Sequence, residues 1–310
     1  MGVAKVLKPL LLMSQVTSII CYKFSKKSFK KSKVLLIYSI LMILLISAAK
    51  DLLTVIWVSS LRKSLVPINL VIIVQILDSA VLQKLALASN LLNSYSICLI
   101  IKNFYILEKI VPLKIKFSQK VFSFSYFIYL LFTFLIVQSN SIGMGVYKRI
   151  DIKTLFINFV NTASRILSQA IFLQFLTSLL IYLYFITELN KQVLKISFKY
   201  QIKILMTADD LLRKSKESID NIYVFPILSF IIELAQNSIY LFMHLTNNSR
   251  KIYYFPSLLL FILLSIFRIL SLSTANHFSN IEVSFVKFYI KYLKRLFCIA
   301  SALQLYVIAL

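Results

Sequence analysis

The 310-residue sequence predicts an all-α, polytopic membrane protein of about seven transmembrane helices, with a cytoplasmic N-terminus and cytoplasmic helix extensions. Three observations predict this fold. The chain is 59% hydrophobic with a mean hydropathy of +0.84, whereas soluble domains are about 45–50% apolar. Long apolar runs recur along the chain, with basic segments between them. The basic residues are shared unequally between alternate segments, which is typical of membrane topology.

The composition argues against an enzyme. Three glycines, two histidines and three cysteines leave no phosphate-binding loop and little material for a metal site or a catalytic triad. We therefore expect no catalytic residues, no metal and no cofactor. The cysteines lie in or beside apolar segments and are expected to be small buried hydrophobes rather than a disulfide framework. The net charge of +24 would suggest nucleic acid in a soluble protein, but in a membrane protein the placement of the charge matters more.

The N-terminus, residues 1–33, ends in the lysine run "SKKSFKKSK", Ser25 to Lys33. Such a run is compatible with a nuclear-localisation signal, a nucleic-acid patch or the cytoplasmic end of a membrane span. An apolar segment follows directly, so the third reading is favoured and no nucleic-acid partner is expected. The preceding stretch "LKPLLLMSQVTSIICY" is short and lacks a small-residue cleavage site, so we expect it to lie in the interface or to re-enter the membrane.

Seven apolar runs flanked by charge predict seven spans. At 1.5 Å per residue, about 20 residues cross the roughly 30 Å hydrocarbon core, and only the last run is short. The predicted spans are Val34–Trp57, Val66–Ala88, Val121–Gln138, Ile166–Ile186, Ile222–Met243, Phe255–Leu272 and Leu296–Leu310.

The connecting segments alternate between rich and poor in Lys and Arg. Counted from the sequence, the N-terminus and the even-numbered loops hold 24 basic residues, and the odd-numbered loops hold eight. The positive-inside rule therefore places the N-terminus in the cytoplasm, opposite to a G-protein-coupled receptor. The N-x-[ST] sequon at Asn247 lies in the fifth loop, which this orientation puts outside, where glycosylation occurs.

The fourth loop, residues 188–221, is predicted to be helical and amphipathic. It contains no Pro or Gly, and apolar residues recur among its lysines. One interpretation is that the fourth and fifth spans continue into the cytoplasm as helices and form a bundle there. The alternative is an amphipathic helix that lies on anionic lipid.

Polar residues inside the predicted spans are the candidates for a ligand site, since an ionisable residue at mid-membrane costs about 2.5–3.5 kcal/mol. Glu233, Asn237 and Tyr240 follow i, i+4, i+7 spacing and share one helix face, which is expected to point to the bundle interior. Asp78 and Lys84 lie in the second span. The predicted ligand-binding residues are Gln138, Gln169, Glu233, Asn237 and Tyr240. The alternative is that these residues only hydrogen-bond helix to helix, at about 0.6 kcal/mol each.

The sequence signals for a transporter or a channel pore are weaker than those for a ligand site. Transporters carry Gly- or Pro-interrupted helices at matching places of two repeats, and no such repeat is evident. Pro226 and Pro256 are predicted near span starts, where proline is tolerated. In the seventh segment, "FCIASALQLYVIAL", Ser301 and Gln304 are candidate pore-lining residues.

The order of these parts resembles the insect gustatory receptors. The opening "LKPLLLMSQVTSIICYKF" resembles their N-terminal segment, "FITELNKQVLK" resembles their Leu-Asn signature after the fourth span, and "ADDLLRKSKESIDNIYVFPILSFI" resembles the stretch that leads into the fifth. The resemblance implies a multi-pass plasma-membrane receptor with seven spans. It also implies a homo- or hetero-tetrameric, ligand-gated cation channel that responds to a small-molecule tastant.

The resemblance also implies a pore lined by the seventh helix, with Tyr306 beside Ser301 and Gln304. The family's C-terminal Thr-Tyr-x-x-x-Leu-x-Gln motif is incomplete here, since Leu305-Tyr306 stand for Thr-Tyr and the chain stops at Leu310. We therefore expect the chain to conduct poorly by itself and to need a complete partner subunit. The rival hypotheses are an N-outside G-protein-coupled chemoreceptor and a small membrane transporter.

Overall fold

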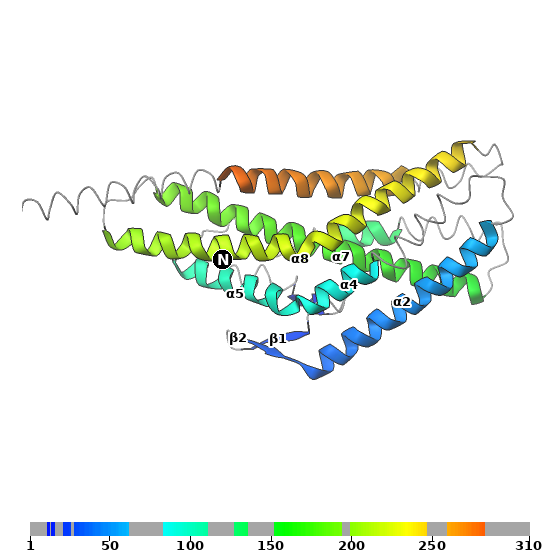
Figure 1. The fold of residues 1–310 in the computed structure, drawn as a ribbon, viewed down its shortest axis with the longest axis horizontal. Helices are drawn as coiled ribbons and strands as arrows, with labels where there is room; N and C mark the ends of the chain where they lie inside the picture. The colour runs from blue at the N-terminus through cyan, green and yellow to red at the C-terminus, as the bar shows by residue number, and fades with distance from the viewer. Residues whose placement is uncertain are drawn as a thin grey trace, which may run out of the picture.

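The structure, a computed structural model, describes residues 11–12, 14–15, 21–25, 28–61, 83–110, 127–135, 152–193, 199–246 and 259–282. Within these ranges the chain is helical except for one two-stranded hairpin and short connections. The longest helices run roughly along the long axis of the molecule (Figure 1). The predicted all-α class is confirmed for the described residues.

Within the described ranges, four helices are long and apolar enough to cross a membrane. They are α2 (Lys33–Leu61), α7 (Ile152–Val193), α8 (Lys199–Thr246) and the helix Leu259–Glu282. They contain or overlap the first, fourth, fifth and sixth predicted spans. By colour in Figure 1, α2 and α8 run from left to right, and α7 and the helix Leu259–Glu282 run back.

The other three predicted spans fall largely outside the described residues. Of Val66–Ala88, only the last part is described, at the start of α4 (Gln83–Leu92). Of Val121–Gln138, residues 127–135 are described and helical. Leu296–Leu310 lies outside the described residues. Seven spans and the cytoplasmic N-terminus therefore stay predictions.

Helix α2 exposes most of its apolar side chains. Only 17% of its span is buried inside the protein, against 67% for the span in α7. Ile37, Leu41, Leu44 and Leu45 are each about 60% exposed. An apolar face of this extent is unusual on a soluble monomer, and in a bilayer the acyl chains solvate it. Helix α2 therefore lies at the edge of the described bundle, with an apolar face suited to contact with lipid, and α7 lies at the centre.

The core joins α7, α8 and α5 (Ser94–Ile110), and aromatic side chains fill it. The rings of Phe175 and Tyr223 stack with 4.2 Å between their centroids, and those of Phe104 and Phe185 stack at 5.7 Å. Helix α5 is tied to α8 by a buried hydrogen bond of 3.2 Å between the Asn103 amide and the Ser215 hydroxyl. Aromatic pairs of this kind add about 0.5–1.5 kcal/mol beyond the area that they bury.

The fourth predicted loop continues the spans as helices. Helix α7 extends to Val193, and α8 begins at Lys199 and runs unbroken through the fifth predicted span. In this part of α8, Ala208, Leu212, Ser215 and Ile219 are buried at helical spacing, so one face packs inward. This arrangement corresponds to the bundle interpretation rather than to a helix that lies on lipid.

Pro226 lies inside α8, just past its midpoint by residue number, and not near the start of a span helix as predicted. The reason is that the helix begins at Lys199, well before the apolar run. Proline removes one backbone hydrogen bond and clashes with the preceding turn, so it bends a helix. Figure 1 shows that α8 changes direction near its middle.

Residues 22–25 and 28–31, which precede and overlap the lysine run, pair as a β-hairpin that the sequence analysis did not predict. Strand β1 (Tyr22–Ser25) pairs antiparallel with β2 (Ser28–Lys31), and α2 begins two residues later. The Ser32 hydroxyl accepts a hydrogen bond of 3.4 Å from the backbone N–H of Leu35, which is an N-cap contact. The alternation of aromatic and lysine residues from Tyr22 was the available signal.

Candidate functional site

A charged cluster joins three of the span-length helices. One carboxylate oxygen of Glu233, on α8, accepts a hydrogen bond of 2.8 Å from Arg268 Nη2, on the helix Leu259–Glu282. Its other oxygen accepts a hydrogen bond from Arg165 Nη1, on α7. We call Glu233, Arg165 and Arg268 the Glu233 cluster. One carboxylate thus links three helices.

The side chains of the Glu233 cluster are largely buried. The side chains of Arg268 and Glu233 are 1% and 5% exposed, and that of Arg165 is 17% exposed. Each guanidinium also lies 4.9 Å from an aromatic centroid, Arg268 over Phe230 and Arg165 over Phe261. Charge pairing and cation–π contacts together offset the desolvation of groups placed within apolar helices.

Two serine hydroxyls complete the surroundings of Arg268. Its Nη1 donates to Ser168 Oγ on α7 at 3.3 Å, and its Nη2 donates to Ser265 Oγ on its own helix at 3.0 Å. The guanidinium is a planar fork with five donors, so it can hold a carboxylate and hydroxyls in one arrangement. Arg268 therefore binds one carboxylate and two hydroxyls at once.

Gln169, one of the predicted ligand residues, lies one turn along α7 from Arg165. It is 1% exposed, and its Oε1 accepts a hydrogen bond of 2.5 Å from the Tyr129 hydroxyl. The Tyr129 ring contacts Phe172, which in turn meets Phe230 edge-on with 6.3 Å between centroids. Gln169 is thus joined to the Glu233 cluster through a short row of aromatic rings.

Two of the three side chains in the predicted stripe on α8 are described, and both are buried. Glu233 is 4% exposed and Asn237 is 2% exposed. The Asn237 Nδ2 atom is buried and has no hydrogen-bond partner among the described residues. Tyr240 is in α8, but its side chain lies outside what the structure describes, as does all of Gln138. Ligand binding at these five residues stays a prediction.

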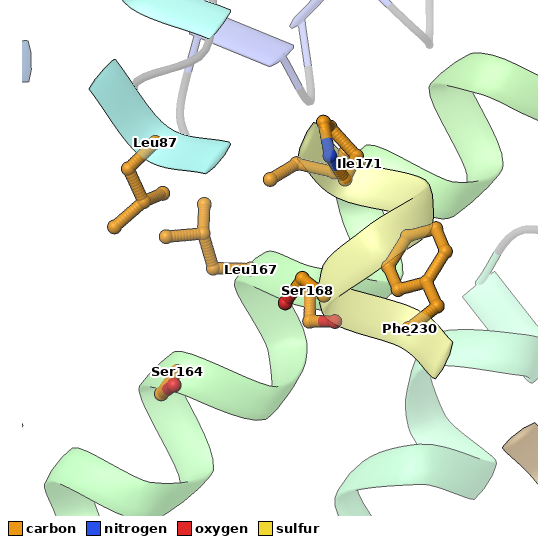
Figure 2. Close-up of a pocket in the computed structure, with 8 residues that line it drawn as sticks. Leu87, Ser164, Leu167, Ser168, Ile171 and Phe230 are labelled. Atoms are coloured by element: carbon orange, nitrogen blue, oxygen red, sulfur yellow. The ribbon is translucent and has the colours of Figure 1, made fainter. Parts of the chain in front are cut away.

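Residues of α4, α7 and α8 line a small pocket (Figure 2). It has a volume of about 30 Å³, and three serines on α7 and α8 supply hydroxyl groups. Ser168, which binds Arg268, and Phe230, on which Arg268 stacks, both line it. The full lining is Leu87, Ser164, Leu167, Ser168, Ile171, Pro226, Ser229 and Phe230. A volume of this size accommodates about one water molecule, so a sugar-sized ligand would need the helices to move apart.

Lys84, which the sequence places in the second predicted span, forms an ion pair with Asp51. Its Nζ lies 2.7 Å from both carboxylate oxygens of Asp51 on α2. The two side chains are 34% and 49% exposed, so the pair links α2 to α4 near the surface. Asp78 lies outside the described residues.

The remaining predicted sites cannot be placed. Ser301, Gln304 and Tyr306, the predicted pore residues, and Asn247, the predicted glycosylation site, lie outside the described residues. Over the described ranges, no group of three or more His, Cys, Asp or Glu side chains could hold a metal. Cys21 and Cys98 are both free and buried there, as expected for small hydrophobes.

Sequence reasoning missed both arginines of the cluster. Arg268 lies within the sixth predicted span, and Arg165 was counted with the basic residues of the third loop. The signal for Arg268 was present, because a buried Glu233 requires a basic partner and an arginine within another span is a direct candidate. Comparisons of this chain with protein-family models and with curated proteins find no match.

Proposed function

We propose that this chain is a subunit of a gustatory-type chemosensory receptor, a ligand-gated cation channel that responds to a small-molecule tastant at the plasma membrane. The tastant contacts polar side chains around the Glu233 cluster. The observation that carries the proposal is the buried carboxylate that links three span-length helices. Ionisable groups in such helices are costly and mark ligand or ion pathways. The resemblance of three sequence segments to insect gustatory receptors supports the same function.

The geometry supports coupling between ligand binding and helix movement. The small pocket is too small for a tastant in this arrangement, and its wall includes Pro226, where α8 lacks a backbone hydrogen bond. A ligand hydroxyl or carboxylate that competes for Arg268 would loosen the link between α8 and the helix Leu259–Glu282. A ligand shifts such an equilibrium only through a difference in affinity between the two arrangements.

The test uses the full chain, purified in detergent and also expressed in cells with other receptor subunits. A panel of sugars, bitter compounds and carbon dioxide is screened for a rise in the thermal unfolding temperature and for cation current. A ligand present at 100 times its dissociation constant stabilises the folded state by about 2.7 kcal/mol, which is readily measured.

Two variants then locate the site. Asn237→Leu and Tyr240→Phe should each weaken the response to an active compound, with normal surface expression. Ser238→Ala is the matched control, because Ser238 is exposed on the same helix and its hydroxyl donates to the Leu234 carbonyl one turn before. If both variants respond like the parent, the stripe serves helix packing and the site is wrong.

A further inference from the structure

The β-hairpin presents a pair of opposed lysines. Lys23 on β1 and Lys30 on β2 are direct partners in the antiparallel register, and both are exposed. Like charges directly opposite each other destabilise a strand pair, and an isolated two-stranded hairpin is marginal in water. The hairpin therefore needs support from the rest of the protein and a counter-charge for its lysine face.

The support comes from the opposite face of the hairpin. Tyr22 precedes Lys23, so its side chain points to the other side of the sheet, where its ring lies 6.1 Å from that of Tyr95 on α5. The Cys21 sulfur lies 3.2 Å from the Ser94 hydroxyl, and the Tyr22 carbonyl accepts a hydrogen bond of 2.7 Å from Gln15. These contacts fix the hairpin against α5 and turn Lys23 and Lys30 outward.

The counter-charge does not come from nearby in the chain. Residues 1–50 contain no Asp or Glu, and no ion pair of Lys23, Lys30, Lys31 or Lys33 occurs among the described residues. Lys33 is exposed as well, and so is Lys31, although Lys31 is the partner of Tyr22 and lies on the other face of the hairpin.

The position of the hairpin indicates what supplies the negative charge opposite its lysines. Strand β2 ends at Lys31, and the candidate membrane span begins at Lys33. Two residues cover at most about 7 Å, so the lysine face lies at the level of the lipid headgroups when α2 crosses the bilayer. Exposed lysines at that level attract anionic lipids.

We propose that the hairpin is a binding site for anionic phospholipid headgroups, with Lys23 and Lys30 as its central cations and Lys33 close to them along the chain. The site neutralises the opposed lysines and fixes the hairpin at the start of α2. The inference rests on the fold and the charge pattern, and it does not depend on the receptor function proposed above.

The experiment measures lipid binding to the full chain in detergent by native mass spectrometry, with phosphatidylserine, phosphatidylcholine and inorganic phosphate as probes. Phosphatidylserine should bind at least about tenfold more tightly than phosphatidylcholine, since each lysine contributes about fivefold. Lys23→Gln alone should lose about fivefold, and Lys23→Gln with Lys30→Gln about 25-fold. Lys23→Arg with Lys30→Arg should keep the affinity. The thermal unfolding temperature of every variant in phosphatidylcholine micelles reports its folding.

Lys102→Gln with Lys109→Gln is the matched control. Both lysines are exposed on α5, so the variant removes the same charge from another surface. The control should keep the affinity within twofold. Equal binding of the two lipids, or an equal loss in the control and the hairpin variant, would overturn the proposal. Displacement of phosphatidylserine by millimolar inorganic phosphate would show a free-phosphate site, which also overturns the assignment to lipid.

Discussion

Removal of Arg268 from the Glu233 cluster should destabilise the protein more than any removal of a surface arginine. In Arg268→Met, the long apolar side chain keeps most of the volume, and the change removes the charge and the donors. Among the described residues, Glu233 then retains Arg165, which is 17% exposed, and one carboxylate oxygen loses its 2.8 Å partner. The effect therefore reports on charge pairing rather than on a cavity.

The magnitude follows from distance and burial. At 2.8 Å and an effective dielectric constant of about 20, the attraction between unit charges is about 6 kcal/mol before desolvation is subtracted. Loss of one partner from a buried pair costs about 3–5 kcal/mol, whereas interhelical polar contacts in membranes average about 0.6 kcal/mol. Because Arg268 is 1% exposed, we expect about 3 kcal/mol. Arg165→Met should cost about 1–2 kcal/mol, because water reaches that side chain.

The assay is reversible unfolding of the full chain in mixed micelles, in which sodium dodecyl sulfate is titrated and the free energy of unfolding is extrapolated. Arg213→Met is the control, because Arg213 is 65% exposed and pairs with Asp210 on the same helix at 3.1 Å. That substitution should cost about 0.5 kcal/mol or less. The double variant Glu233→Met with Arg268→Met completes a thermodynamic cycle. Its cost should be at least about 1.5 kcal/mol below the sum of the single costs.

Two results would refute the reasoning. One is a cost below about 1 kcal/mol for both Arg268→Met and Glu233→Met, which would place the cluster in the range of ordinary interhelical contacts. The other is strict additivity in the cycle, which would mean that the two side chains do not depend on each other. Either result would also remove the main support for the proposed function.

Three further predictions test orientation, thiol chemistry and the junction of α5 and α8. An N-terminal tag should stain only after permeabilisation, and Asn247→Gln should abolish glycosylation; a tag that stains intact cells contradicts the topology. Burial raises the pKa of the Cys98 thiol to about 12, so at pH 9 it should be alkylated about 500-fold more slowly than an ordinary thiol. Because the folded-state pKa is raised, stability from Cys98 is complete below about pH 9 and is lost above it; a fast reaction of the folded chain would contradict the burial. Ser215→Ala should cost about 1 kcal/mol through its bond to Asn103, and a cost equal to that of the exposed control Ser238→Ala would show that the bond contributes nothing.

Only part of the candidate site could be predicted from the sequence. Periodicity alone put Glu233 and Asn237 on one face of a buried helix, and both are buried. The partners of Glu233 are 68 residues before it and 35 residues after it. Helical spacing relates residues within one helix and carries no information on which helices are neighbours. The charge rule that oriented the chain counts loop residues, so it passed over Arg268 and assigned Arg165 to a loop.

The sequence by itself predicted that this protein lies in a membrane, and it determined the helical character of its apolar runs. Apolar runs of sufficient length can satisfy their backbone groups in lipid only as helices, and this constraint acts locally. The tertiary structure decided the rest: that α8 runs through Pro226 as one bent helix, that the lysine run folds back as a hairpin against Tyr95, and that Glu233 meets two arginines. The physical reason is the sequence separation of the interacting residues. Helix formation depends on neighbours within a few residues. Strand pairing and charge pairing depend on packing between distant segments, which no local pattern records.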